Sequence, residues 1–159
     1  MNNDQLVTAF AATMQASLHG LNSLEPILEH EHLALSGRDP GRLETIVKEK
    51  MTLLQQLQHS VQARERLQQA AGFDTGNAGG DALVAAIAND DVAREWHKLL
   101  NLAAQVAGLN DRNGQLAAFG ERSTKQAIGI LTGRDQTDHT YSTLRHRKRA
   151  AGGYSLAHA

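Results

Sequence analysis

Hydrophobic residues recur along this chain at alternating steps of three and four, the spacing that places side chains on one face of an α-helix. One such stretch covers about residues 4–36, and a second covers about residues 40–71. Between them, Gly37 suits a helix end, Asp39 suits an N-cap and Pro40 suits a first helical turn. The pattern therefore predicts an antiparallel helical hairpin. Its second helix should close the hairpin with Leu43, Val47, Lys50, Leu54, Leu57, Val61, Arg64 and Gln68.

A third long stretch covers about residues 91–132 and ends before Gly133. It is preceded by a short apolar stretch, 81–88, and by a segment with four glycines, 71–81, which we interpret as a non-helical linker. The predicted fold is all-α, with three long helices and one short helix in a coiled-coil-like bundle. The apolar face of the third helix comprises Val92, Trp96, Leu99, Ala103, Val106, Asn110, Asn113, Ala117, Gly120, Thr124, Ala127 and Leu131.

Two charged residues interrupt these apolar faces on either side of the predicted turn. Glu31 precedes the turn and Lys50 follows it at a nearly matched distance, so an antiparallel hairpin brings them level. We expect them to form an ion pair that sets the register of the helices with little net gain in stability. A catalytic role is disfavoured, because a lone Glu/Lys pair is not an acid/base site.

The sequence L-N-D-R-N-G-Q-L, residues 109–116, places polar and helix-weakening residues in the middle of the third helix. We expect Asn110 and Asn113 to face the hairpin and to hydrogen-bond across it, because a buried amide without partners is costly. Gly114 would allow another backbone to approach closely. A role in register is favoured, and direct ligand binding is the open alternative.

The predicted helix lengths indicate an uncovered apolar surface. At ~1.5 Å per residue the first two helices measure roughly 50 Å each and the third roughly 60 Å. Antiparallel to the second helix, the third would extend past the turn, leaving Ile128, Ile130 and Leu131 poorly covered. Such a surface would be available to bind a partner.

After Gly133 the periodic pattern is lost, which predicts a helical domain over 1–133 and a flexible tail over 134–159. The basic run Arg145–Arg149 raises nucleic-acid binding as an alternative function. Tyr141 and Tyr154 are isolated aromatics in this tail. Each is either an anchor for a partner's pocket or a chance occurrence, and the residues alone leave both open.

Composition narrows the function classes. The chain has no cysteine and a formal charge of -1, and it has no long apolar run, so disulfides, a strong overall field and a membrane span are not expected. The eight histidines lack the spacing of a metal site. No nucleophile motif or phosphate loop is present. We expect a cytoplasmic protein that is not an enzyme and uses no metal or cofactor.

The chain resembles the FlgN family of flagellar export chaperones over most of its length. The resemblance is carried by E-x-x-A-L at 31–35, L-x-x-I-V-x-x-K-x-x-L-L-x-x-L at 43–57 and W-x-x-L-x-x-L-A-x-x-V at 96–106. It continues with L-N-x-x-N-G-x-L at 109–116, I-L-T-G at 130–133 and Thr140-Tyr141. Together, and in this order, these motifs are more specific than any one of them.

The resemblance implies a cytoplasmic, non-enzymatic chaperone for the C-terminal helical regions of the hook-filament junction proteins FlgK and FlgL. Such a chaperone keeps these clients unassembled and delivers them to the type III export apparatus. The family's long C-terminal helix implies client binding over 116–131, for which we select Leu116, Phe119, Ala127, Ile128, Ile130 and Leu131.

The resemblance also implies docking of a tail tyrosine on the export-gate protein FlhA, here through Tyr141. The family often has Tyr-Gly at this step, whereas this chain has Tyr141-Ser142. We expect a monomer or homodimer that neither inserts into membranes nor binds nucleic acid. The rival from another class is a self-assembling helical scaffold or secretion-system component, which would form large assemblies on its own.

Overall fold

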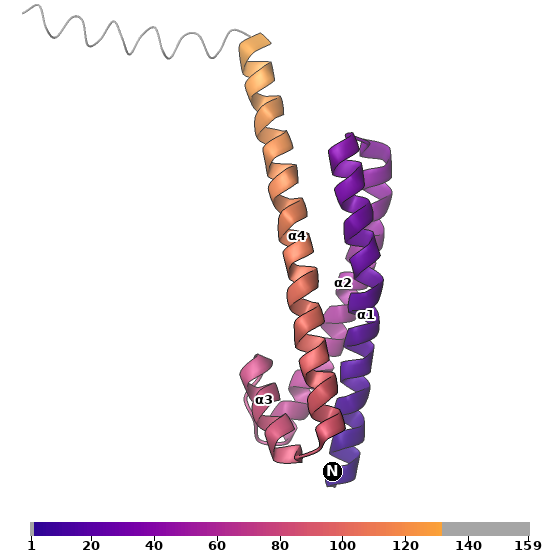
Figure 1. Cartoon of the computed structure of the whole chain (residues 1–159), viewed down its shortest axis with the longest axis vertical. Helices are drawn as coiled ribbons and strands as arrows, with labels where there is room; N and C mark the ends of the chain where they lie inside the picture. The colour runs from indigo at the N-terminus through magenta and orange to yellow at the C-terminus, as the bar shows by residue number, and fades with distance from the viewer. Residues whose placement is uncertain (1, 132–159) are drawn as a thin grey trace, which may run out of the picture. The chain divides into compact units, whose positions relative to one another are not determined.

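The computed structural model describes residues 2–131 of the chain, and their side chains as far as Thr124. These residues form four helices, α1 (Asn3–Gly37), α2 (Pro40–Ala70), α3 (Gly76–Ile87) and α4 (Asp90–Leu131) (Figure 1). The predicted all-α class, with three long helices and one short one, is confirmed over this range. The chain divides into two units, Met1–Leu116 and Ala117–Ala159, and α4 continues from the first into the second.

The helix ends follow local sequence chemistry. Asn2 and Gln5 form a capping box at the start of α1, in which the Gln5 amide donates to Asn2 Oδ1 over 2.8 Å. Asp39 caps α2 by accepting from the Arg42 amide, and Pro40 occupies the first turn as predicted. The left-handed residue that ends α1 is Arg38, with φ 53°, one position after the predicted Gly37.

Only the first part of the glycine-rich segment 71–81 is the predicted non-helical linker, and the remainder is helical. α3 begins at Gly76 instead of 81, and Gly79 and Gly80 are buried. A Cβ on Gly79 would lie 1.7 Å from the Asp74 carbonyl oxygen, and one on Gly80 would lie 2.4 Å from the Trp96 ring. These glycines therefore let the first turns of α3 pack closely, and burial against Trp96 outweighs their low helix propensity.

The buried core of the first unit is built from residues of α1, α3 and the first half of α4. Phe10 packs against Trp96 with ring centroids 6.0 Å apart. The other buried members of this cluster are Met14, Leu18, Leu21, Leu24, Leu28, Leu83, Val84, Val92, Leu99 and Val106. At roughly 1.5–3 kcal/mol for each fully buried large apolar side chain, this cluster is the main source of stability of the unit.

Three polar contacts between α1 and α4 on the surface show the direction in which α4 runs. Gln15 bonds to Glu95 over 2.8 Å, Gln105 bonds to Glu25, and Arg112 pairs with Glu29 at 3.2 Å. Because the residue numbers rise together on both helices, α4 runs parallel to α1. It is therefore antiparallel to α2, as predicted (Figure 1).

The buried face of α2 differs from the predicted one. Val47 and Leu54 were expected in the hairpin seam, but each is 42% exposed, and Met51 beside them is 57% exposed. Ile46 is buried instead, with Leu53 and Leu57 partly buried against the core. The prediction was wrong because α2 carries two adjacent apolar stripes, and periodicity does not decide which of them α1 covers.

Candidate functional site

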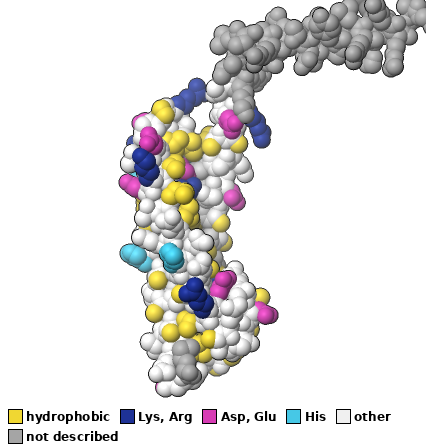
Figure 2. Space-filling view, turned by 180° about the vertical axis from the view of Figure 1, so that it is seen from behind, with side chains coloured by type: hydrophobic (Ala, Val, Ile, Leu, Met, Phe, Trp, Pro, Cys, Tyr) yellow, Lys and Arg dark blue, Asp and Glu magenta, His cyan; other side chains and the backbone are white. Residues whose placement is uncertain are grey.

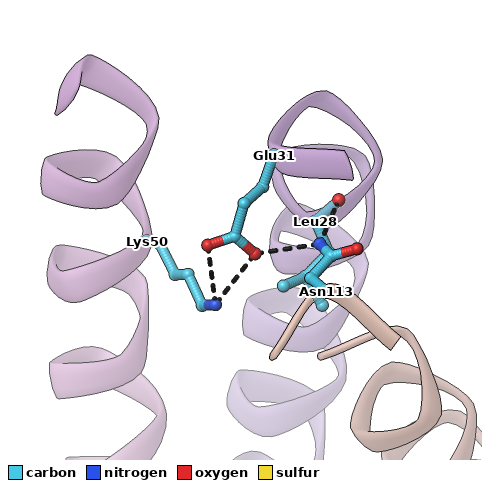
Figure 3. A network of polar contacts seen from close by, with 4 residues as sticks. All are labelled: Leu28, Glu31, Lys50 and Asn113. Atoms are coloured by element: carbon cyan, nitrogen blue, oxygen red, sulfur yellow. Dashed lines mark hydrogen bonds and ion pairs between the residues drawn. The ribbon is translucent and has the colours of Figure 1, made fainter. Parts of the chain in front are cut away.

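A polar network joins α1, α2 and α4 at one level (Figure 3). Lys50 Nζ lies 3.0 Å from each carboxylate oxygen of Glu31. Asn113 Nδ2 donates to Glu31 Oε2 over 2.9 Å and to the Leu28 carbonyl oxygen over 2.7 Å. The predicted Glu31–Lys50 pair is thus present, and Asn113 extends it to the third long helix.

Burial makes this network a position-specific contact. Glu31 and Asn113 are 7% and 2% exposed, so a shift of α4 by one turn would remove one donor from the buried Glu31 carboxylate and leave the buried Asn113 amide without its partners. Asn113 Oδ1 has no partner among the described residues, so both amide hydrogens are used and the oxygen is not. The geometry is consistent with a register role, which remains a prediction until stability is measured.

Two neighbours of Asn113 do not behave as predicted. Asn110 is exposed and forms no contact across the hairpin, so only one of the two asparagines is a bridging residue. A Cβ on Gly114 would meet nothing within 4 Å, so no backbone approaches it closely. Both residues are exposed on α4.

A cavity of ≈ 500 Å³, which we call the Arg64 cavity, lies between α1, α2 and α4. Ser17 and Leu21 of α1 line it, and α4 contributes Leu99, Leu100, Ala103 and Ala104. The remaining lining residues are Leu57, Val61 and Arg64 of α2 and Asn77 of α3. The lining is mostly apolar, and Arg64 supplies its one charged group.

The exposed apolar side chains Val47, Met51 and Leu54, here called the α2 stripe, continue the α2 wall of this cavity. Leu54 precedes Leu57 by three residues and Val61 by seven, so they share one side of the helix. Figure 2 shows hydrophobic side chains gathered along the upper half of the molecule on this face. Sequence reasoning missed this surface, although the doubled apolar pattern of α2 was its signal.

Arg64 is a buried cation without a counter-ion. Its residue is 7% exposed, and its guanidinium lies over the Trp96 ring at 5.1 Å from the centroid. Its Nε has no hydrogen-bond partner, and no described carboxylate forms an ion pair with it. Burial lowers the pKa of Arg64 from its usual value, an effect that the neighbouring Glu65 opposes. The Trp96 ring is also held at its edge, where Nε1 donates to Asp81 over 2.6 Å.

The predicted client-binding residues lie in the second half of α4. Leu116 is partly buried within the first unit, and Phe119 in the second unit is 67% exposed. The positions of Ala127, Ile128, Ile130 and Leu131 belong to the helix, but their side chains are outside the described set. Tyr141, Tyr154 and Arg145–Arg149 lie outside the described residues altogether.

Other kinds of site find no support in the part of the chain that the structure describes. No group of three or more His, Asp or Glu side chains there could hold a metal ion. No helix there is long and apolar enough to cross a membrane. The described residues do expose large apolar side chains on long helices.

Long helices that expose apolar side chains at helical spacing define a helical protein-binding module. The model of the FlgN family, described as "FlgN protein", matches residues 1–144. The chain therefore belongs to the FlgN family, a family of flagellar export chaperones. No curated protein and no solved structure matches it.

Proposed function

We propose that this protein is the export chaperone of the hook-filament junction proteins FlgK and FlgL, and that it binds their C-terminal helical regions in the cytoplasm. Membership of the FlgN family supports a flagellar export chaperone in general. Binding would keep the aggregation-prone amphipathic ends of the clients unassembled before export.

The observation that carries the location of client binding is Phe119. A phenylalanine that is 67% exposed on a helix offers a large apolar area to a partner. It follows Leu116 by three residues, and Ala127, Ile128, Ile130 and Leu131 extend the apolar pattern to the end of α4. These six residues are the proposed client-binding surface.

Charge substitutions on this surface test the proposal. Phe119→Asp, Ile128→Asp and Leu131→Asp should each abolish binding of the purified C-terminal segments of FlgK and FlgL, measured by calorimetry. Burying a carboxylate in an apolar contact is expected to reduce affinity by about a hundredfold or more. Gln115→Asp is the matched control, because it adds the same charge at an exposed polar position of α4. Unchanged affinity in all three variants would refute the assignment.

Docking on the export gate is proposed separately, at Tyr141. It rests on the family resemblance, since this residue lies outside the described part of the chain. Tyr141→Ala should abolish capture of the cytoplasmic part of FlhA while leaving client affinity unchanged. Capture at the wild-type level would place the docking site elsewhere.

A further inference from the structure

The Arg64 cavity contains a buried N–H donor for which the described part of the chain provides no acceptor. A guanidinium carries five N–H donors, and burying it without a carboxylate or other acceptors is costly. Arg64 contacts the Trp96 ring face at 5.1 Å, and the neighbouring Glu65 acts on it electrostatically without forming an ion pair. The Nε–H remains unpartnered although the residue is more than nine-tenths buried. An acceptor for this N–H would complete the site, and the positive charge of the guanidinium favours an anionic one.

The surroundings of Arg64 restrict the anion to one carried by an apolar body. Among the ten lining residues, only Ser17 and Asn77 add further polar side chains. The Ser17 hydroxyl is already engaged with the Thr13 carbonyl and with Ser60. A highly charged anion such as a phosphate would lose its hydration against Leu57, Val61 and Leu100 with few donors to replace it. A single carboxylate on an aliphatic segment fits better.

The shape of the surface favours a helix. From Val47 to Arg64 the α2 stripe and the cavity extend for roughly 25 Å, about five helical turns. Across the cavity, α4 contributes the small side chains Ala103 and Ala104, which allow a neighbouring helix to approach closely. Residues 2–131 form helices and no strand, so an extended peptide finds no sheet edge to pair with. A helix satisfies its own backbone and requires side-chain contacts alone.

We propose that the α2 stripe and the Arg64 cavity together bind one amphipathic helix of the client, and that an acidic side chain on its apolar face pairs with Arg64. This inference rests on the proposed function for the identity of the client. It goes beyond that function by assigning a second contact surface, built from α1, α2 and α4 within Met1–Leu116, and by specifying a carboxylate as its recognition element.

The first test uses a small probe that is independent of the client. Trp96 is the single tryptophan of the chain and lies against Arg64, so its fluorescence reports on the cavity. Octanoate should shift the Trp96 emission at concentrations at least about tenfold lower than octylamine, because only the carboxylate pairs with the guanidinium. Arg64→Met should remove this preference. Arg66→Met, an exposed arginine on the same helix, should preserve it. Equal responses to octanoate and octylamine would overturn the anion site.

The second test measures client affinity by calorimetry with the full-length chain and the FlgK and FlgL C-terminal segments. Arg64→Met and the cavity-filling Ala104→Trp should each weaken binding by about tenfold or more, whereas Arg66→Met and the exposed Ala12→Trp should stay within about twofold. Replacing each client Asp or Glu by its amide should reveal one position whose effect disappears in the Arg64→Met background.

The outcomes distinguish the two proposals. If the segments bind the wild type and neither cavity variant weakens them, the second surface is wrong and the proposed function stands. If neither segment binds the wild type, the proposed clients are wrong, and with them the occupant named here. The octanoate preference then still decides whether Arg64 forms an anion site. Sedimentation that shows a dimer disrupted by Ala104→Trp would replace the client helix by a second copy of the chain.

Discussion

Two cations on α2, Lys50 and Arg64, are bound in opposite ways. Lys50 reaches both oxygens of Glu31, and Asn113 adds a further donor to the same carboxylate. Arg64 is more deeply buried, yet its described partners are limited to the face of Trp96. In the Lys50 network the cation and the carboxylate are paired within the chain, and only Asn113 Oδ1 lacks a described partner. At Arg64 the cation itself has an unpartnered Nε–H beside a cavity. We infer that the first serves the fold and the second serves binding.

The largest expected effect concerns the Glu31–Lys50 ion pair. Lys50→Met leaves the buried Glu31 carboxylate without its cation, so the free energy of unfolding should fall by about 2–4 kcal/mol. Urea unfolding followed by circular dichroism measures this change. Lys48→Met is the matched control, because its ion pair with Glu44 is exposed, with side-chain exposures of 74% and 70%. The control should change stability by less than about 0.5 kcal/mol. Equal losses of stability in the two variants would contradict a larger contribution from the buried Glu31–Lys50 pair.

The second effect concerns the bridge to α4. Asn113→Leu removes the donor to Glu31 and to the Leu28 carbonyl, and should lower the free energy of unfolding by about 1–3 kcal/mol. Combined with Lys50→Met it should be non-additive, because both residues bond to the same carboxylate. Asn110→Ala is the matched control. Since Asn110 is exposed, that change should be neutral or slightly stabilising.

The third effect should have the opposite sign. Arg64→Met replaces a buried cation that has no counter-ion by an apolar side chain of similar length, which removes a desolvation cost. The lost contact with the Trp96 ring, about 0.5–2 kcal/mol, opposes this gain. We expect stability to be unchanged or to rise by about 1–2 kcal/mol in the same urea assay. A loss of about 3 kcal/mol would show that Arg64 has an internal partner and would end the contrast with Lys50.

The smallest effect concerns Gly114, on the exposed surface of α4. Gly114→Ala should raise the free energy of unfolding by about 0.5–1 kcal/mol, because the residue is helical and an added Cβ meets nothing within 4 Å. Gly80→Ala is the opposing control, since its Cβ would lie 2.4 Å from Trp96 and should destabilise the unit. A destabilising Gly114→Ala would revive the close backbone approach first expected there.

Local sequence chemistry predicted much of this molecule. Asp39 and Pro40 mark the start of α2, and the apolar spacing marks three long helices, because capping and periodicity depend on residues within a few positions of one another. The Glu31–Lys50 pair was predictable for a related reason. A tight turn between two helices makes the distances from the turn comparable, so residues far apart in sequence are placed level.

The same reasoning failed wherever a choice between neighbours was needed. Periodicity is satisfied equally by Ile46 and Leu53 or by Val47 and Leu54, and contact with α1 selected the first pair. Of the two asparagines in L-N-D-R-N-G-Q-L, the rotation of α4 buried Asn113 and exposed Asn110. Neither choice is encoded within a few residues of the position concerned.

The sequence by itself determined the class of fold, the approximate extent of the helices, their antiparallel hairpin and the resemblance to the FlgN family, which the family model confirms. Tertiary structure alone decided that Gly79 and Gly80 lie inside α3, that Asn113 bonds to the Glu31–Lys50 pair, and that Arg64 lies buried beside a cavity without an ion-pair partner. The physical reason is that caps and periods act over one or two helical turns. Burial, by contrast, depends on how whole helices rotate against one another to cover the largest apolar area.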